Sequence, residues 1–233
     1  MSAQSEQLLR TIQQGFGGGH TLTAINFHNT PQRMADEYDR QFALIAEHFA
    51  PTREDDLAHF LATGRWPTSR PGIVLAFYNG YRNNFDVAYP LLEKHGLVGW
   101  FLAASGYVSC SPSEQLEFGK TRTLRTMKDE YPDGRYALSW NECRILDRNH
   151  VVGSHTRNHT RVSIENALAL DQEIVGAQED FTQELGHPVR SFAWLFGGAY
   201  GENPLADIHV DRAGYEFLFS NFKLQRLPRP AAQ

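Results

Sequence analysis

Short apolar runs rich in β-branched and aromatic residues alternate along this chain with longer segments of helical periodicity. The runs that predict strands are Thr21–Phe27, Ile73–Phe77, Val98–Ala103, Val151–Gly153, Phe192–Phe196 and Phe217–Phe219. Apolar residues recur at helical spacing in Ala35–Phe49, Asn84–His95, Leu138–Arg148 and Ile164–Leu185. Strand–helix alternation is typical of a parallel sheet or an α/β barrel, in which helices cover the strands. We therefore predict an α/β fold.

The longest predicted helix, Ile164–Leu185, has a start signal and a stop signal. Ser163 stands directly before it as an expected N-cap, and Gly186 follows its last apolar residue. Its carboxylates read as a solvated helix face; they are Asp171, Glu173, Glu179 and Asp180.

The chain has 233 residues, which fits one domain. We expect residues 21–228 to form it, preceded by an N-terminal helix and a glycine-rich link in residues 1–20. The 22 Lys and Arg stand against 27 Asp and Glu, and the net charge of -5 argues against a nucleic-acid partner. No apolar run approaches the roughly 20 residues of a membrane span, and the polar N-terminus lacks a signal core, so we predict a cytoplasmic protein.

Two histidines, His155 and His159, come directly after the predicted strand Val151–Gly153. Imidazoles four residues apart on one helical turn can bind one metal ion together. Ten histidines in a chain of this length give about 0.4 such pairs by chance, so the spacing alone is weak. The position at the end of a strand, where α/β barrels place catalytic groups, strengthens the prediction of a metal site.

A second polar cluster follows the strand Ile73–Phe77, which ends in Tyr78, Asn79 and Gly80. Glycine permits a sharp turn there, and polar groups at the end of a buried strand lie on the active edge of such a sheet. We expect the mixed segment Ser105–Pro132 to be an insertion close to the same edge.

Five blocks of the chain resemble, in order, motifs of the polysaccharide deacetylases, metal-dependent enzymes that remove N-acetyl groups from amino sugars. The blocks are Asn26–His28, Ala76–Tyr81, Gly153–His159, Phe192–Gly197 and Ala213–Tyr215. Gly153–His159 matches the family's Gly-Ser-His-Thr-x-x-His, and Ala76–Tyr81 stands where the family has Thr-Phe-Asp-Asp-Gly-Tyr. The resemblance covers about residues 21–228.

The resemblance implies a distorted (β/α) barrel of about seven strands, similar to a TIM barrel. It implies a divalent metal ion, zinc or similar, held by His155, His159 and the residue at position 79, which is Asn79 here. Such an ion polarises the acyl carbonyl and lowers the pKa of water. The implied protein is a hydrolase of carbohydrate metabolism whose substrate is an N-acylated amino sugar or glycan.

The chain departs from the family at the two acidic positions of the first motif. Tyr78 stands where the family has its general base, and a phenol with an ordinary pKa near 10 is mostly protonated at neutral pH. Asn79 stands where the family has a metal carboxylate, and a neutral amide oxygen lowers the affinity for a divalent ion. Leu195 replaces a family proline, and His209 lies near, but outside, the late motif that supplies the acid in many members.

Three explanations of these departures stay open. The chain is a deacetylase with another base, for which His28 and Asp86 are the nearest candidates; or it is a pseudoenzyme that binds a glycan or nucleotide sugar; or it is an inactivated variant. We expect an N-deacetylase of low activity, with the non-catalytic binder as the alternative. Aromatic residues at a barrel mouth can stack on sugar rings; the candidates are Trp194, Phe196 and Tyr200.

Overall fold

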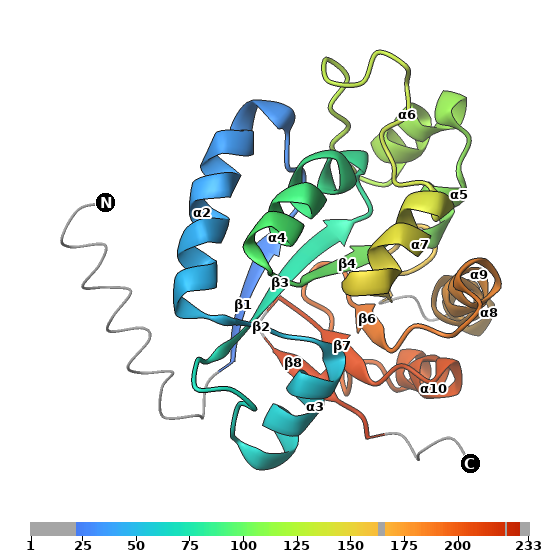
Figure 1. Cartoon of the computed structure of the whole chain (residues 1–233). Coiled ribbons are helices and arrows are strands. Elements are labelled where there is room, and N and C mark those ends of the chain that lie inside the picture. Colours follow the sequence, from blue (N-terminus) through green and yellow to red (C-terminus); the bar gives the residue numbers. More distant parts are fainter. Residues whose placement is uncertain (1–21, 163–165, 222, 229–233) are drawn as a thin grey trace.

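The computed structural model describes residues 22–162, 166–221 and 223–228. In this part of the chain one curled sheet runs in the order β1-β3-β4-β5-β6-β7-β8, and the short strand β2 pairs with β3 (Figure 1). Neighbouring strands are parallel except β7 and β8. The strands are β1 Thr23–Phe27, β2 Ala50–Pro51, β3 Gly72–Asn79, β4 Gly99–Ala103, β5 Val151–Ser154, β6 Ser191–Ala193, β7 Phe217–Phe219 and β8 Leu224–Arg226.

The first and last strands of the sheet, β1 and β8, have no pairing with each other among the described residues. The seven strands on the main path therefore form an open half-barrel. The predicted distorted α/β barrel of about seven strands is confirmed in this form.

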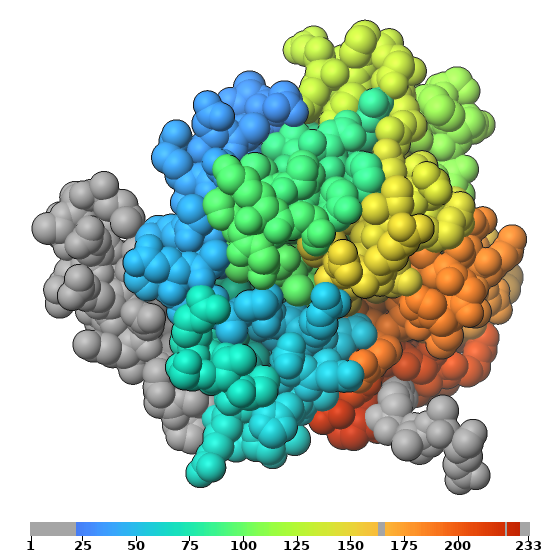
Figure 2. All heavy atoms as spheres, in the orientation of Figure 1, coloured from blue at the N-terminus to red at the C-terminus, as the bar shows by residue number. Residues whose placement is uncertain are grey.

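Helices cover the outer face of the sheet, as Figure 1 shows for α2, α4 and α7. In the space-filling view of Figure 2 the side chains of these helices close this face of the molecule. The helical elements are η1 Gln32–Met34, α2 Ala35–His48, α3 Glu54–Thr63, η2 Asn84–Ala88, α4 Tyr89–His95, α5 Ser105–Ser109, α6 Pro112–Thr121, α7 Trp140–Asn149, α8 Ala167–Leu170, η3 Asp171–Val175, α9 Gly176–Leu185 and α10 Pro204–Ala213.

Strand β3 is buried along its whole length, which explains its unbroken apolar sequence. Its alternate side chains enter two different core clusters. Ile73, Leu75 and Phe77 pack under the helices, and Phe77 stacks on Phe101 of β4 at 5.0 Å between ring centroids. The residues between them face the inside of the half-barrel, where Trp100 fills the interior. This strand is therefore fully packed beneath the residues that follow it.

Several element boundaries differ from the sequence prediction. The long helix begins at Ala167 rather than near Ile164, because Asn166 caps it by accepting from the N–H groups of Leu168 and Ala169. The predicted cap Ser163 lies outside the described residues, as do the N-terminal helix and link predicted in residues 1–20. Gly186 follows the last helical residue in the left-handed conformation, and glycine is the usual residue at this position of a helix C-terminus.

Strand β6 ends at Ala193, three residues before the predicted end at Phe196. Phe196 has a φ of 52°, so the chain has already turned away from the sheet. Within the described residues, no helix is both long enough and apolar enough to cross a membrane.

Candidate active site

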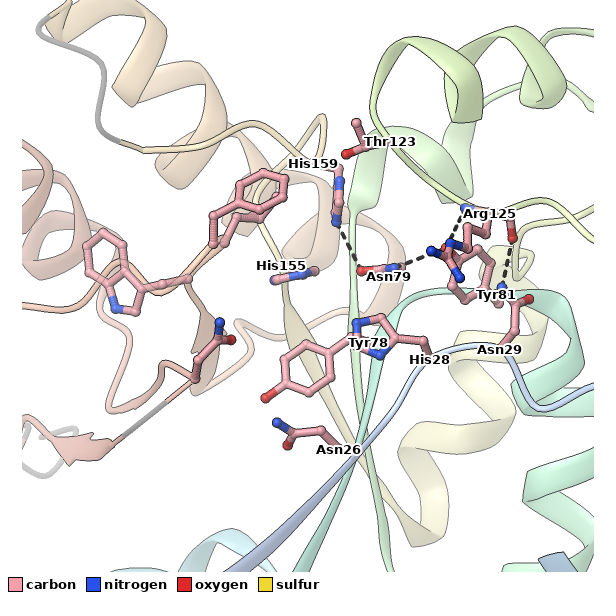
Figure 3. A pocket seen from close by; sticks show the side chains of 14 residues that line it. Asn26, His28, Asn29, Tyr78, Asn79, Tyr81, Thr123, Arg125, His155 and His159 are labelled. Atoms are coloured by element: carbon pink, nitrogen blue, oxygen red, sulfur yellow. Dashed lines mark hydrogen bonds between the residues drawn. The ribbon is translucent and has the colours of Figure 1, made fainter. Parts of the chain in front are cut away.

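A cavity of about 530 Å³ opens at the carboxyl ends of the parallel strands β1, β3, β5 and β6 (Figure 3). This is the edge at which parallel α/β folds place their reacting groups. The described residues that line it are Asn26, His28, Asn29, Tyr78, Asn79, Tyr81, Thr123, Arg125, His155, His159, Trp194, Leu195, Phe196 and Asn221. The cavity thus joins the two polar clusters that the sequence places after separate strands.

His155 and His159 lie on an irregular loop after β5, and the prediction that a helical turn aligns them is wrong. Thr156 and His159 have φ values of 64° and 52°, which a right-handed helix does not allow. The N–H group of His155 donates to the carbonyl of Ala103 at 2.9 Å, which extends the β4–β5 pairing by one bond. The curl of this loop brings the two imidazole centroids to 5.1 Å from each other.

A buried carboxylate on the long helix holds this loop in place. Glu173 is only 6% exposed and accepts from both the N–H group and the side-chain amide of Asn158, each at 2.8 Å. Asp180 accepts from Arg157 at 2.9 Å. The prediction of a solvated acidic helix face is therefore wrong for these two residues. The π-helical turn η3 shifts the side-chain register of the helix by about one residue, which turns Glu173 toward the loop.

Backbone carbonyls fix which nitrogen of each imidazole faces the cavity. Nδ1 of His155 lies 3.0 Å from the carbonyl oxygen of Ala193, and Nδ1 of His159 lies 2.8 Å from that of Arg122. Burial lowers the pKa of His155 to about 3 and also lowers the pKa of His159, so both rings are neutral at pH 7. A neutral ring that donates from Nδ1 leaves Nε2 with a lone pair, and this arrangement is the usual one for metal-binding histidine.

Asn79 adds an oxygen to this pair because its backbone leaves the regular strand. Successive strand residues point to opposite faces, so a regular β3 would separate Asn79 from Tyr78. The φ of 79° at Asn79, a residue type that tolerates the left-handed region, lets both side chains line the cavity. Gly80, with a φ of 81°, continues the turn, and a side chain there would meet Ala103.

The donor set of the two histidines and Asn79 fits a divalent cation. Nδ2 of Asn79 donates to Oη of Tyr81 at 3.1 Å, which directs Oδ1 at Nε2 of His159, 3.0 Å away (Figure 3). With its Nδ1 proton donated to a carbonyl, neutral His159 has no second proton for this contact. The lone pairs of Oδ1 and Nε2 repel each other, and a cation bound by both atoms removes this repulsion. Because the set contains no carboxylate, it binds such a cation weakly.

Tyr78 and His28 form the wall of the cavity beside this set. Their rings stack at 5.6 Å, and the edge of Tyr78 meets His155 at 5.3 Å. Burial raises the pKa of Tyr78 to about 12, and Figure 3 shows its hydroxyl directed away from Asn79 toward Asn26. Burial, together with the positive charge of Arg125, lowers the pKa of His28, so this imidazole is unprotonated at pH 7.

The structure does not bring every predicted site residue to the cavity. Asp86 accepts from Nε of Arg82 at 3.0 Å and from the hydroxyl of Tyr131 at 3.1 Å, outside the lining. The hydroxyl of Tyr200 donates to Asp211. Trp194 and Phe196 do line the cavity, whereas Tyr200 and His209 are absent from its described lining.

Sequence reasoning missed several lining residues, chiefly Arg125, Thr123 and Asn29. Asn29 directly follows His28, so its position at the end of a strand was a usable signal. Arg125 lies in the loop between α6 and α7, and its place depends on two tertiary hydrogen bonds. Its N–H group donates to Oη of Tyr81 at 2.9 Å, and its carbonyl accepts from Asn29 at 2.7 Å.

A known protein family matches this chain in sequence. The sequence model of the polysaccharide deacetylase family matches residues 65–217, which include β3, the histidine loop and β6. The chain belongs to the polysaccharide deacetylase family. The family is one of carbohydrate deacetylases, which are hydrolases.

Individual relatives of this deacetylase-family chain are distant. It is 25% identical over 148 residues to the poly-beta-1,6-N-acetyl-D-glucosamine N-deacetylases of Escherichia coli K12 and O157:H7. The match covers 59% of this chain and 21% of those proteins, so the chain spans about a fifth of their length. The match therefore does not assign the substrates of those proteins to this chain.

Solved structures share the fold. The deacetylase PplD of Streptococcus pyogenes, in complex with acetate, superimposes with a TM-score of 0.64 at 15% identity, over 83% of this chain and 80% of that one. IcaB of Ammonifex degensii gives a TM-score of 0.61 at 18% identity, over 85% and 83%. The likeness to these structures supports the half-barrel fold.

Proposed function

We propose that this chain is a metal-dependent hydrolase that removes an N-acetyl or other N-acyl group from an amino sugar or a sugar-containing metabolite, with low activity in the present sequence. The proposal rests on one observation: His155, His159 and Asn79 lie close together in the cavity lining. The two imidazoles are held in the tautomer that leaves Nε2 free. Both family membership and the cavity at the carboxyl ends of the strands support this proposal.

The reaction adds water to the acyl carbonyl, breaks the C–N bond and leaves a proton on the amine. When bound, a divalent ion such as zinc polarises that carbonyl and lowers the pKa of the attacking water. His155, His159 and Asn79 would hold the ion, and this neutral set binds it more weakly than a set with a carboxylate. Low occupancy is the first reason to expect low activity.

The second reason is the lack of a strong base. Tyr78, whose pKa burial raises to about 12, stays protonated at pH 7 and accepts no proton from water. His28 lines the same cavity and is neutral, so it is the residue we propose as the remaining base. Its lowered pKa makes it a weak one. Asp86 is engaged with Arg82 and Tyr131, and we do not assign it this role.

A non-catalytic binder of glycans or nucleotide sugars is the second candidate. One observation favours it: among the described lining residues there is no Asp or Glu, so the cavity holds no anionic base. Trp194 and Phe196 line the cavity and offer apolar faces to a sugar ring.

The double variant Tyr78→Asp with Asn79→Asp separates the two candidates. Acetate release from an oligosaccharide of N-acetylglucosamine is measured with added zinc for the variant and the parent chain. General-base catalysis contributes about 10²–10⁴-fold, so we expect at least a 100-fold rise in kcat/KM. The same double variant with His155→Ala is the control, and it should return to the parent rate.

Binding of the sugar without acetate release by either protein would support the binder and contradict the hydrolase. Ordinary enzymatic rates in the parent chain, abolished by His28→Gln, would support an active enzyme with His28 as its base. The cytoplasmic location predicted from the sequence remains a prediction.

A further inference from the structure

The charge of the cavity differs from that of the chain as a whole. The chain carries a net charge of -5, but the described residues that line the cavity include one arginine, Arg125, and no carboxylate. The cavity is therefore a locally positive site on an acidic protein.

The guanidinium of Arg125 has no ion-pair partner within the described ranges of the chain. Arginines elsewhere, such as Arg82, Arg135 and Arg190, each pair with a carboxylate at 2.7–2.8 Å. In the same loop, Glu130 accepts hydrogen bonds from Gln32 and Asn83. The positive charge of Arg125 acts on the cavity itself, since it lowers the pKa of His28.

The backbone of Arg125 is held on the cavity wall from both sides. Its N–H group donates to Tyr81, which follows β3, and its carbonyl accepts from Asn29, which follows β1. Figure 3 shows Arg125 beside Tyr81 and Asn29, with its side chain directed toward the middle of the site. An arginine anchored in this way is positioned to receive an anionic group.

Amide side chains complete the surroundings of this charge. Asn26, Asn29, Asn79 and Asn221 line the cavity, and each amide both donates and accepts hydrogen bonds. A cavity of about 530 Å³ is large enough for a monosaccharide with an acyl group and a further substituent. Amides suit the hydroxyl groups of a sugar, and the guanidinium suits a carboxylate or phosphate.

We propose that the ligand of this cavity is an N-acylated amino sugar that also carries an anionic group, a carboxylate or a phosphate, which binds Arg125. The inference rests on the proposed function for the sugar, but the anion site follows from the charge of the lining alone. Arg125 acts here as a specificity residue, because a neutral sugar makes no use of its charge.

Calorimetric titration of the whole chain tests the proposal with matched probes. These are N-acetylglucosamine, its 6-phosphate, N-acetylmuramic acid and inorganic phosphate. Charge-assisted hydrogen bonds are roughly twice as strong as neutral ones, so we expect one of the anionic sugars to bind at least tenfold more tightly than the neutral one. Arg125→Gln should remove that preference, so that the anionic and neutral sugars bind this variant about equally. Arg125→Lys should retain most of it.

Arg148→Gln is the matched control, because Arg148 is exposed and lies at the end of α7, away from the cavity lining. Equal affinity for neutral and anionic sugars, or equal losses in Arg125→Gln and Arg148→Gln, would overturn the inference and leave the proposed function standing. Binding of inorganic phosphate that Arg125→Gln abolishes, with no sugar bound, would support the anion site and contradict the proposed sugar substrate. No binding of any anionic probe would overturn the inference.

Discussion

The two edges of the half-barrel differ in whether their charged side chains have ion-pair partners. At the amino edge, Glu216 is buried between two arginines: Nε of Arg190 donates to it at 2.9 Å and Nε of Arg226 at 2.8 Å. Arg190 also pairs with Asp55 at 2.8 Å. At the carboxyl edge, the described cavity lining has one arginine and no carboxylate to pair with it. Charge is thus neutralised at one edge and left available for a ligand at the other.

Backbone strain also distinguishes the two edges, because residues in strained conformations lie at the carboxyl edge. The non-glycine residues with positive φ include Asn79, Thr156, His159 and Phe196. Asn79 is the last residue of β3, and the other three lie in the segments that follow β5 and β6. Such conformations cost about 1–3 kcal/mol each and persist where the surrounding structure enforces them. The carboxyl edge thus holds both unpaired polar groups and strain, which are typical of a functional site rather than of a supporting one.

Among changes to charged side chains, removal of the buried carboxylate of the amino edge should have the largest effect on stability. Glu216→Ala leaves Arg190 and Arg226 without their buried partner, and breaking such a network costs about 3–5 kcal/mol. Urea denaturation measures the free energy of unfolding. Asp55→Ala is the control, since its side chain is 89% exposed and its pair with Arg190 contributes at most about 1 kcal/mol. Equal losses in the two variants would mean that the amino edge does not depend on its buried charge.

Lowering the pH should destabilise the folded protein through His150, which lies at the amino edge directly before β5. Its Nδ1 accepts from the N–H group of Gly99 at 3.1 Å, which requires an unprotonated nitrogen. Burial lowers its pKa to about 4 and outweighs the carboxylate of Glu93, 3.1 Å from Nε2; Arg53 lowers it further. Between pH 6.5 and pH 4 the unfolded chain therefore binds more protons at this position, and stability falls as the pH falls.

The loss due to His150 should reach about 3 kcal/mol at pH 4, from a shift of more than two pKa units. His150→Asn keeps an acceptor for Gly99 but does not titrate, so its unfolding free energy should vary less with pH in this window. Chemical denaturation of both proteins at several pH values measures the difference. Parallel pH profiles would show that His150 is not a titrating contributor.

The smallest effect is expected for an aromatic residue of the carboxyl edge. Phe196 is 56% exposed and has a φ of 52°. Phe196→Gly relieves a left-handed strain of about 1–2 kcal/mol, which offsets the lost contacts, so the unfolding free energy should change by at most about 1 kcal/mol. Phe192→Ala, in the fully buried core, should cost about 3–5 kcal/mol. Similar losses from the two variants would contradict the strain at Phe196.

Strands β3 to β7 were predictable because they are buried along their whole length and lie in apolar runs, as Ile73–Phe77 does. The short strands β2 and β8, which are partly exposed, were not predicted. The histidine pair was also predictable, but not its geometry: the approach of His155 and His159 depends on positive φ values and on the buried Glu173. Arg125 could not be predicted, because no local periodicity fixes an irregular loop whose position depends on Tyr81 and Asn29.

The central claim is that the carboxyl edge brings His155, His159 and Asn79 together around one point that accepts a divalent ion. A crystal of the protein soaked with zinc, with diffraction measured at the zinc absorption edge, tests it directly. We expect one anomalous peak within bonding distance of Nε2 of both histidines, about 2.0–2.1 Å, with Oδ1 of Asn79 directed at it. Imidazoles that diverge, or zinc bound elsewhere while this point stays without a peak, would contradict the account.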